Sequence, residues 1–334
     1  MRTAPRRGAA LLLAMLILTL VATLAGGMVW QQNRSLQVEA AERARAQSLW
    51  ILSGALDWAR LILSEDMRSS RSQGGLQVDS LDEPWATPLA EARLSTFLAA
   101  DRDNNADSGP EAFISGSIVD AQSRWNLRRL VDAAGKIVPG ELMTLELLCA
   151  QANLPGGTAQ RLAEGLRRAW TPPGLAADNQ PGPADAATDD VVLAPQRMAD
   201  LAWLGIEADW LQRLAAWVDI LPVPTPVNVN TAPREVLAAA IDGLDLGSAE
   251  RLVQARQRKP FGSIEDVKAL LSESQMQDLT RVSVTSSWFE VTGRLRLEDR
   301  AVEERSLIER RPGQVLVVRR ERLNLSLNDQ RQVP

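Results

Sequence analysis

The side chains that could do chemistry in these 334 residues are carboxylates, guanidinium groups and one thiol. The chain has 42 Asp and Glu and 37 Lys and Arg residues, but no His and no Tyr. Without His there is no Ser-His-Asp or Cys-His triad, and the commonest general base and zinc ligand are missing. The single thiol, Cys149, lies in an apolar run and fits a small buried hydrophobe. We therefore expect no enzyme.

Acidic loops are the remaining candidates for a metal site. Residues 101–107 offer carboxylate and amide oxygens at short intervals, but this loop lacks the glycine and the bidentate Glu of an EF-hand. The sequence also contains no P-loop, no Rossmann glycine fingerprint and no CxxC pair. We therefore expect no metal ligand and no cofactor, and interpret the loop as solvated.

The next feature is an uncharged segment, Ala9–Trp30, that follows three arginines within Met1–Gly8. About twenty apolar residues cross the hydrocarbon core of a membrane as a helix, and a basic flank stays in the cytoplasm. A cleavable secretory signal has a shorter apolar stretch and a small-x-small site. The best such site, near Ala25, is poor. We therefore predict a retained single-pass membrane anchor.

Good helix formers continue from Gln31 to Arg60. Apolar residues recur at spacings of three and four there, which places them on one helical face. We predict one helix from Ala9 to about Leu63 that packs this face on a sheet of the same chain and that could bend at Gly26-Gly27. The apolar face consists of Leu49, Leu52, Leu56, Ala59 and Leu63.

The rest of the chain predicts an α+β fold, in which strands at both ends bracket a helical block at 141–280. Alternating apolar and polar residues mark the strands, and helical spacing marks the block. We also expect a short helix at 89–99. The expected strands are 113–119, 289–297, 303–310 and 314–320, and the expected helices of the block are 141–152, 158–170, 207–220, 233–241, 248–257 and 263–271.

The junction Arg6-Arg7-Gly8-Ala9 resembles a type IV prepilin leader, a short basic peptide that ends in Gly. The resemblance implies that a prepilin peptidase cleaves after Gly8 and methylates the new N-terminus, Ala9. Most members of that family have Glu as the fifth mature residue, whereas this chain has Leu13. The minor pseudopilin K family of type II secretion systems also lacks this Glu, which elsewhere pairs with the N-terminal amine of a neighbouring subunit.

Further motifs resemble the same family along nearly the whole chain. Asp82-Glu83-Pro84-Trp85-Ala86-Thr87-Pro88 matches a D-E-x-W-A-x-P pattern, and the residues from Ile118 to Leu127 match I-x-D-x-x-x-R-F/W-N-L. We interpret Asn126 and Asn228 as structural residues that bond backbone at a turn or a helix start. The resemblance implies five parts: a leader (1–8), a transmembrane assembly helix (9–30), a pilin-like domain in two segments (31–140 and 281–334) and an inserted helical domain (141–280).

The resemblance also implies a function. The chain would be a minor pseudopilin in the inner membrane, with its C-terminal domain in the periplasm, that caps the tip of the pseudopilus and helps initiate its assembly. Its partners would be the minor pseudopilins of the I and J types, the prepilin peptidase, the major pseudopilin and the inner-membrane platform. Some relatives bind calcium near an acidic G-A-E-D segment, which this chain lacks. The assembly helix would pack through Leu11, Leu12, Leu13, Leu16 and Leu20.

Residues 228–266 are similar to the helix-hairpin-helix module of DNA-uptake proteins, which gives a second function, a membrane-anchored DNA receptor. That module binds phosphate with the backbone amides of its turn and with basic residues nearby. Here Asp242 and Asp245 lie in the turn, and acidic residues balance basic ones. DNA binding needs a cationic face, so we expect the fold of the module without nucleic-acid binding. We expect Thr231 to be the N-cap and Pro233 a first-turn residue of the first helix of the module.

A third possible function is that of an anchored periplasmic protein with no role in a pilus.

Overall fold

The structure is a computed structural model that describes residues 7–72, 77–94, 112–171, 193–276, 278–297 and 300–325. The chain forms two compact units, Met1–Ala55 and Leu56–Pro334. Helix α1 runs without a break from Arg7 to Ser72 and is longer than predicted at its C-terminal end. Gly26 and Gly27 stay helical, so they do not interrupt the helix. The described part of the first unit consists of this helix alone.

The second unit contains a five-stranded sheet with the order β1-β2-β7-β8-β9. Every neighbouring pair is antiparallel. Strands β2 and β7 are in continuous register from the pair Ala112 and Leu297 to the pair Asp120 and Phe289. The three expected C-terminal strands and the expected strand at 113–119 are confirmed. The strands are β1 (Leu89–Arg93), β2 (Ala112–Asp120), β7 (Trp288–Leu297), β8 (Arg300–Arg311) and β9 (Gln314–Leu325).

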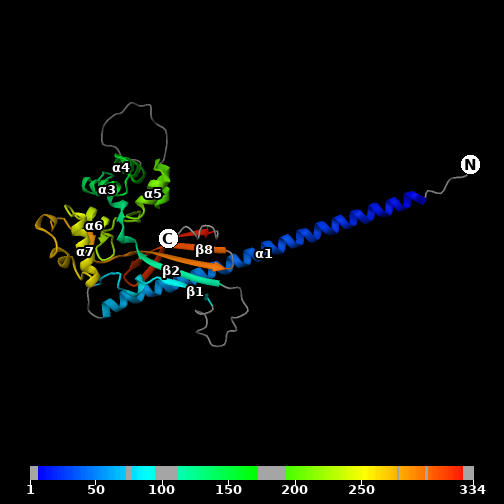
Figure 1. The fold of residues 1–334 in the computed structure, drawn as a ribbon, viewed down its shortest axis with the longest axis horizontal. Helices are drawn as coiled ribbons and strands as arrows, with labels where there is room; N and C mark the ends of the chain where they lie inside the picture. Colours follow the sequence, from blue (N-terminus) through cyan, green and yellow to red (C-terminus); the bar gives the residue numbers. More distant parts are fainter. Residues whose placement is uncertain are drawn as a thin grey trace, which may run out of the picture. The chain divides into compact units, whose positions relative to one another are not determined.

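One face of the sheet packs on the part of α1 that belongs to the second unit (Figure 1). Leu56, Ala59 and Leu63 of α1 are buried in one cluster with Phe289 of β7 and Ile308 of β8, among other residues. The alternation of apolar and polar residues in β7 therefore places its apolar side against the helix. The apolar face predicted for this helix is confirmed for these three residues.

Trp85 extends this core from the segment that precedes β1. Its side chain is 1% exposed, and its ring meets Phe289 edge-on, with 5.2 Å between the centroids and 74° between the planes. A short 3-10 helix, Pro84–Ala86, positions the Trp. The D-E-x-W-A-x-P motif thus contributes a buried aromatic anchor to the sheet–helix core.

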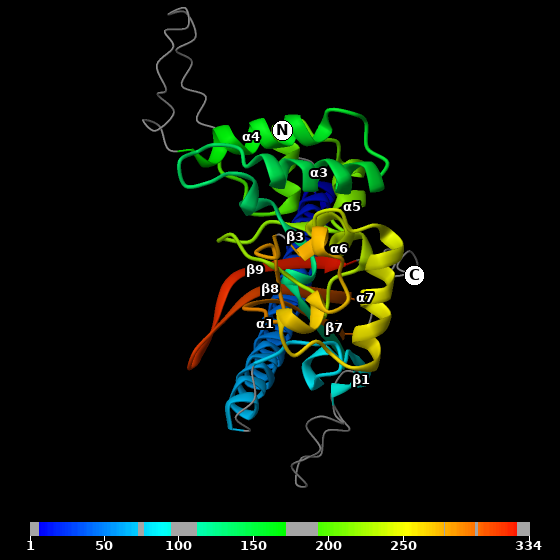
Figure 2. The same ribbon diagram turned by 90° about the vertical axis from the view of Figure 1, so that its left-hand side faces the viewer.

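Between β2 and β7 the chain forms a helical block with a core of its own (Figures 1 and 2). Helices α3 and α4 pack on each other, α3 also contacts α6, and α6 packs on α7. Two short parallel pairs, β3 with β4 and β5 with β6, join segments of this region and were not predicted. Cys149 is buried in this core, and burial raises the pKa of its thiol to about 12. The helices are α3 (Pro139–Gln151), α4 (Thr158–Trp170), α5 (Ala208–Leu214), α6 (Arg234–Ala240), α7 (Leu246–Arg258) and α8 (Ile264–Lys268), and the short strands are β3 (Trp125–Asn126), β4 (Val218–Asp219), β5 (Val227–Asn228) and β6 (Val282–Ser283).

Three predicted helices are wrong in type or length, and one of them, expected at 263–271, ends already at Lys268. The segment expected as a helix at 89–99 begins with strand β1, because pairing with β2 overrides the helix propensity of its Ala and Glu residues. The helix expected at 207–220 ends at Leu214, and Val218-Asp219 pairs with Trp125-Asn126 instead. Residues 95–99 and the acidic loop at 101–107 lie outside the described residues.

Candidate functional site

The first unit presents the predicted assembly helix as exposed apolar surface. Helix α1 contains a window with a mean hydropathy of 2.4, none of which is buried in the structure, and the helix is long and apolar enough to cross a membrane. Leu13, which stands where most type IV prepilins have Glu, is 61% exposed. The other predicted assembly residues, Leu11, Leu12, Leu16 and Leu20, are also exposed.

The predicted processing site lies at the start of α1. Gly8 and Ala9 are helical, while Met1–Arg6 lie outside the described residues. Cleavage after Gly8 and methylation of Ala9 remain predictions.

The second unit contains a buried polar junction that joins the sheet to the helical block. Asp120, at the end of β2, is fully buried, and its Oδ2 accepts hydrogen bonds from Ser286 Oγ and Thr231 Oγ1, both 2.6 Å long. The same oxygen accepts one from Asn228 Nδ2 at 2.9 Å, and Oδ1 accepts one from the Gln122 amide at 2.8 Å. Burial raises the pKa of Asp120, and the hydrogen bonds oppose this shift.

This junction corrects one detail of the sequence analysis. Thr231 is not the N-cap of α6, because its hydroxyl donates to Asp120 instead. Pro233 takes the N-cap position, and α6 begins at Arg234.

Both motif asparagines bond backbone as predicted: Asn126 Oδ1 accepts from the amides of Arg128 (3.0 Å) and Leu221 (3.1 Å), and Asn228 Oδ1 accepts from the amide of Asn230 (3.0 Å). The bonds from Asn228 to the side chains of Asp120 and Ser286 were not predicted.

A buried ion cluster continues the junction toward α1 and the segment that precedes β1. Arg310 of β8 donates to Asp66 Oδ2 at 2.7 Å, to Asp79 Oδ1 and to the Ser286 carbonyl at 2.8 Å. Asp79 Oδ2 accepts from the Ser286 amide at 2.7 Å. Since Arg310 is nearly fully buried, it depends on these carboxylates to compensate for its lost hydration.

Glu83 is the third carboxylate of this cluster. The pKa of Glu83 is raised to about 8, chiefly by burial and also by the charges of Asp66 and Asp79. The hydrogen bond from the Trp85 indole N–H and the charge of Arg310 partly oppose this rise. Oxygens of these three carboxylates lie within 4.8 Å of one another, a spacing that a cation could bridge. Arg310 already brings a positive charge to this place, so we interpret the cluster as an internal ion pair with one carboxyl in its protonated form.

In the turn of the helix-hairpin-helix module, carboxylates of the turn itself bond the backbone amides and a nearby arginine. Asp245 Oδ1 accepts the backbone amides of Gly247 and Ser248 at 2.8 and 3.0 Å. Asp242 pairs with Arg281 at 2.7 Å. The amides that would bind a phosphate in a DNA-binding member therefore already have an acceptor.

The sequence identifies Asp120, Asn228 and Glu83 only as motif residues. Nothing in it predicts that Asp120 and Asn228 meet or that Arg310 belongs to the site. Alternation places Arg310 on the same face of β8 as the buried Ile308, but the charge of an Arg by itself favours an exposed position.

Comparison with known proteins agrees with this geometry. The family model for type II secretion system (T2SS) protein K matches residues 227–289, which contain the helix-hairpin-helix module and the start of β7. Type II secretion system protein K of Pseudomonas aeruginosa is 29% identical over 95% of this chain and 92% of its own length. The protein of the same name from Pectobacterium carotovorum is 28% identical over 95% of this chain and 96% of its own.

A solved structure has the same fold. A chain in the crystal structure of the GspK-GspI-GspJ complex of the enterotoxigenic Escherichia coli type 2 secretion system aligns with a TM-score of 0.59. The alignment covers 85% of this chain and 98% of that one, at 18% sequence identity. The chain is therefore similar along nearly its whole length to type II secretion system protein K, and it has the fold of the solved complex chain.

Proposed function

We propose that this chain is a minor pseudopilin that caps the tip of a type II secretion pseudopilus and helps initiate its assembly, for protein export across the outer membrane. The observation that carries the proposal is the match to protein K along 95% of the chain. The role is mechanical: the chain works by contact with other subunits, without catalysis and without a cofactor.

The proposed location is the inner membrane of a Gram-negative cell, with a single pass and the C-terminal domain in the periplasm. The exposed apolar part of α1 is long enough for one crossing, and the arginines before it favour a cytoplasmic N-terminus. A prepilin peptidase then has access to Gly8 from the cytoplasmic side. Cleavage after Gly8 and methylation of Ala9 follow from this arrangement.

The proposed partners come from the solved relative, whose complex contains GspK, GspI and GspJ. By analogy, this chain associates with minor pseudopilins of the I and J types, and Leu11, Leu12, Leu13, Leu16 and Leu20 supply apolar contacts between the helices. The major pseudopilin and the inner-membrane platform are its further partners during assembly.

Two features support a terminal position in the pseudopilus. First, Leu13 leaves the assembly helix without a carboxylate that could pair with the N-terminal amine of a subunit above. Second, the helical block is fixed to the sheet by the buried hydrogen bonds of Asp120. A block that is fixed in this way occupies space that a stacked subunit would need.

The first experiment is to determine the mass of the N-terminal peptide of the chain from host membranes, with and without the prepilin peptidase gene. We expect a methylated peptide that begins at Ala9 and that depends on the peptidase. An intact start at Met1 or Arg2 would remove the pseudopilin assignment. A start near Gly26 would indicate a secreted protein without an anchor.

The second experiment locates the chain on assembled pseudopili by immunogold labelling. We expect label at the ends only, whereas label along the shaft contradicts the cap.

The rival DNA-receptor function is tested by titrating the full chain with duplex DNA at low salt. Because Asp245 uses the turn amides, we expect no saturable binding.

A further inference from the structure

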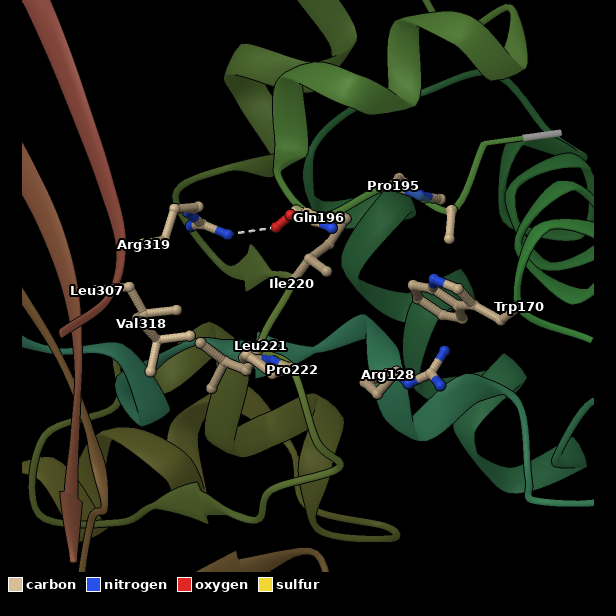
Figure 3. Close-up of a pocket in the computed structure, with 11 residues that line it drawn as sticks. Arg128, Trp170, Pro195, Gln196, Ile220, Leu221, Pro222, Leu307, Val318 and Arg319 are labelled. Carbon is tan, nitrogen blue, oxygen red and sulfur yellow. Dashed lines mark hydrogen bonds between the residues drawn. The ribbon is translucent and has the colours of Figure 1, made fainter. Parts of the chain in front are cut away.

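A cavity of about 370 Å³ lies where the helical block meets the outer face of the sheet (Figure 3). Its volume falls in the range of ligand pockets, which are mostly apolar and carry a few polar groups. Strands β8 and β9 form one wall through Leu307 and Val318, and the segment Ile220–Pro222 forms the floor. The opposite wall comes from Arg128 and Trp170, and Pro195 with its neighbours closes one side.

Arg128 is the charged group of this cavity that has no counter-ion among the described residues. Its guanidinium lies over the Trp170 ring, 4.6 Å from the centroid, which fixes its orientation. Burial alone lowers its pKa, and no carboxylate opposes that shift. Its neighbours in sequence differ: Arg124 pairs with Asp219 at 2.8 Å, and Arg129 pairs with Glu141 at 2.7 Å.

The second arginine of the cavity is already engaged. Arg319 donates to the Gln196 carbonyl and pairs with Glu321 at 3.2 Å. Pro195 and Pro222 have no backbone N–H, so the walls on which they lie offer few hydrogen-bond donors. The cavity thus combines an apolar lining with one available, oriented cation.

We propose that this cavity is a docking site for a peptide segment of another protein that presents an apolar side chain next to a carboxylate. The apolar side chain fills the space between Leu221, Leu307 and Val318. The carboxylate pairs with the guanidinium of Arg128, whose planar fork suits bidentate binding. A polyanion such as DNA does not fit, because it needs several cations. The proposal does not depend on a position at the pseudopilus tip.

The test is a selection of peptides on the full chain in lipid nanodiscs. A phage-displayed library of random heptapeptides is selected on these nanodiscs after depletion on empty ones. The enriched peptides are synthesised with a fluorescent label and titrated by polarisation. We expect enrichment of sequences in which Asp or Glu adjoins Leu, Ile, Val or Phe.

Arg128→Gln should weaken binding of these peptides about tenfold or more, since a charge-assisted hydrogen bond is lost. Val318→Glu, at an exposed position of the opposite wall, should weaken it as well by placing a charge where the apolar side chain of the peptide packs. The matched control is Arg168→Gln, which removes the same charge from α4 at an exposed position outside the lining. Circular dichroism melts confirm that all three variants fold.

Three results overturn the proposal: no enrichment over empty nanodiscs, enriched peptides without acidic residues, or equal binding by Arg128→Gln and the wild type. A fourth result would also overturn it, because the chain itself has acidic residues that could pair with Arg128. Residues 172–192 contain Asp178, Asp185, Asp189 and Asp190. If deletion of residues 174–190 tightens peptide binding about tenfold, that segment competes for the cavity. The occupant is then internal, and the proposal of a partner is wrong.

Discussion

Asp120 and Asn228 lie 108 residues apart in the chain and are joined by a buried hydrogen bond of 2.9 Å between Asn228 Nδ2 and Asp120 Oδ2. The bond connects the last residue of β2 to β5, at the entrance of the helix-hairpin-helix module. Thr231 and Ser286 complete the environment of the same carboxylate oxygen. One acidic side chain therefore accepts several of the buried hydrogen bonds that attach the helical block to the sheet.

Asp120→Ala should lower the free energy of unfolding of the full chain by about 3 kcal/mol, because it leaves several buried donors without an acceptor. Urea unfolding in detergent micelles, followed by tryptophan fluorescence, measures this change. Asp209→Ala is the control, since the Asp209 side chain is 73% exposed and forms only a surface pair with Arg213. Equal effects of the two substitutions would show that the Asp120 junction is not a stabilising element.

Stability should fall as the pH rises from about 5 to 8, and Glu83 should cause part of this slope. In the unfolded chain Glu83 loses its proton near pH 4.5, whereas in the folded chain it keeps the proton until about pH 8. Between these values the folded state binds more protons, so a higher pH favours unfolding. The raised pKa values of Asp66, Asp79 and Asp120 act in the same direction as the pH rises above the normal pKa of an Asp.

Glu83→Gln isolates the contribution of this side chain, because Gln is neutral at every pH and keeps an oxygen for the Trp85 indole. We expect a flatter pH profile in the variant. Between pH 5 and 8 the unfolding free energy of the wild type should fall by about 1–2 kcal/mol more than that of the variant, after allowance for partial solvent exposure. Urea titrations at pH 5, 6, 7 and 8 measure it, and parallel profiles of variant and wild type would refute the role of Glu83.

Leu63→Ala should cost about 3–5 kcal/mol of unfolding free energy, because Leu63 is fully buried between α1 and the sheet and its truncation leaves a cavity. Leu61→Ala, two residues earlier on the same helix, is the matched control, since Leu61 is 64% exposed. It should change the free energy by less than about 0.5 kcal/mol. A large effect at Leu61 would mean that the opposite face of α1 also packs on the chain.

Gly116→Ala should destabilise the sheet by about 1–3 kcal/mol. A Cβ atom at Gly116 of β2 would lie 2.8 Å from the backbone carbonyl oxygen of Thr292 in β7, and backbone cannot move aside as a side chain can. Gly54→Ala in α1 is the opposite case, because nothing beyond the adjacent residues and the backbone of its own helix lies within 4 Å of its Cβ position. That change should stabilise the helix by about 0.5–1 kcal/mol. Thermal unfolding tests both predictions: the melting temperature should fall for Gly116→Ala and rise for Gly54→Ala.

The elements that were predicted well are those whose own residues determine them. The alternation in Phe289–Leu297 predicts β7 without reference to any partner, and α4 begins and ends where its spacing of apolar residues indicates. The errors concern segments whose structure depends on a distant partner. Residues 89–93 form a strand because they pair with β2. Val218, which was expected in a helix, pairs with Trp125.

The same reason explains what sequence reasoning found of the candidate site. Gly8, Ala9 and the leucines of the assembly helix follow from local patterns of charge and hydropathy. The side chains that bind Asp120 and Arg310 come from segments more than a hundred residues away, and no local pattern indicates which hydroxyl or carboxylate will reach them. Thr231 shows the effect on a single side chain: a good N-cap residue by local rules donates to a buried carboxylate instead.

Asp120 and Phe289 are opposite one another in the β2–β7 ladder. The whole helical block, from Ala121 to Trp288, is therefore the loop of a single β-hairpin in topological terms. Its two ends are neighbours on adjacent strands, so a short turn could replace it without changing any strand register of the sheet. The entropy of closing a loop grows only slowly with its length, and a folded insert with adjacent ends adds little to that cost. A pilin-type sheet can acquire, exchange or lose such a block in one step.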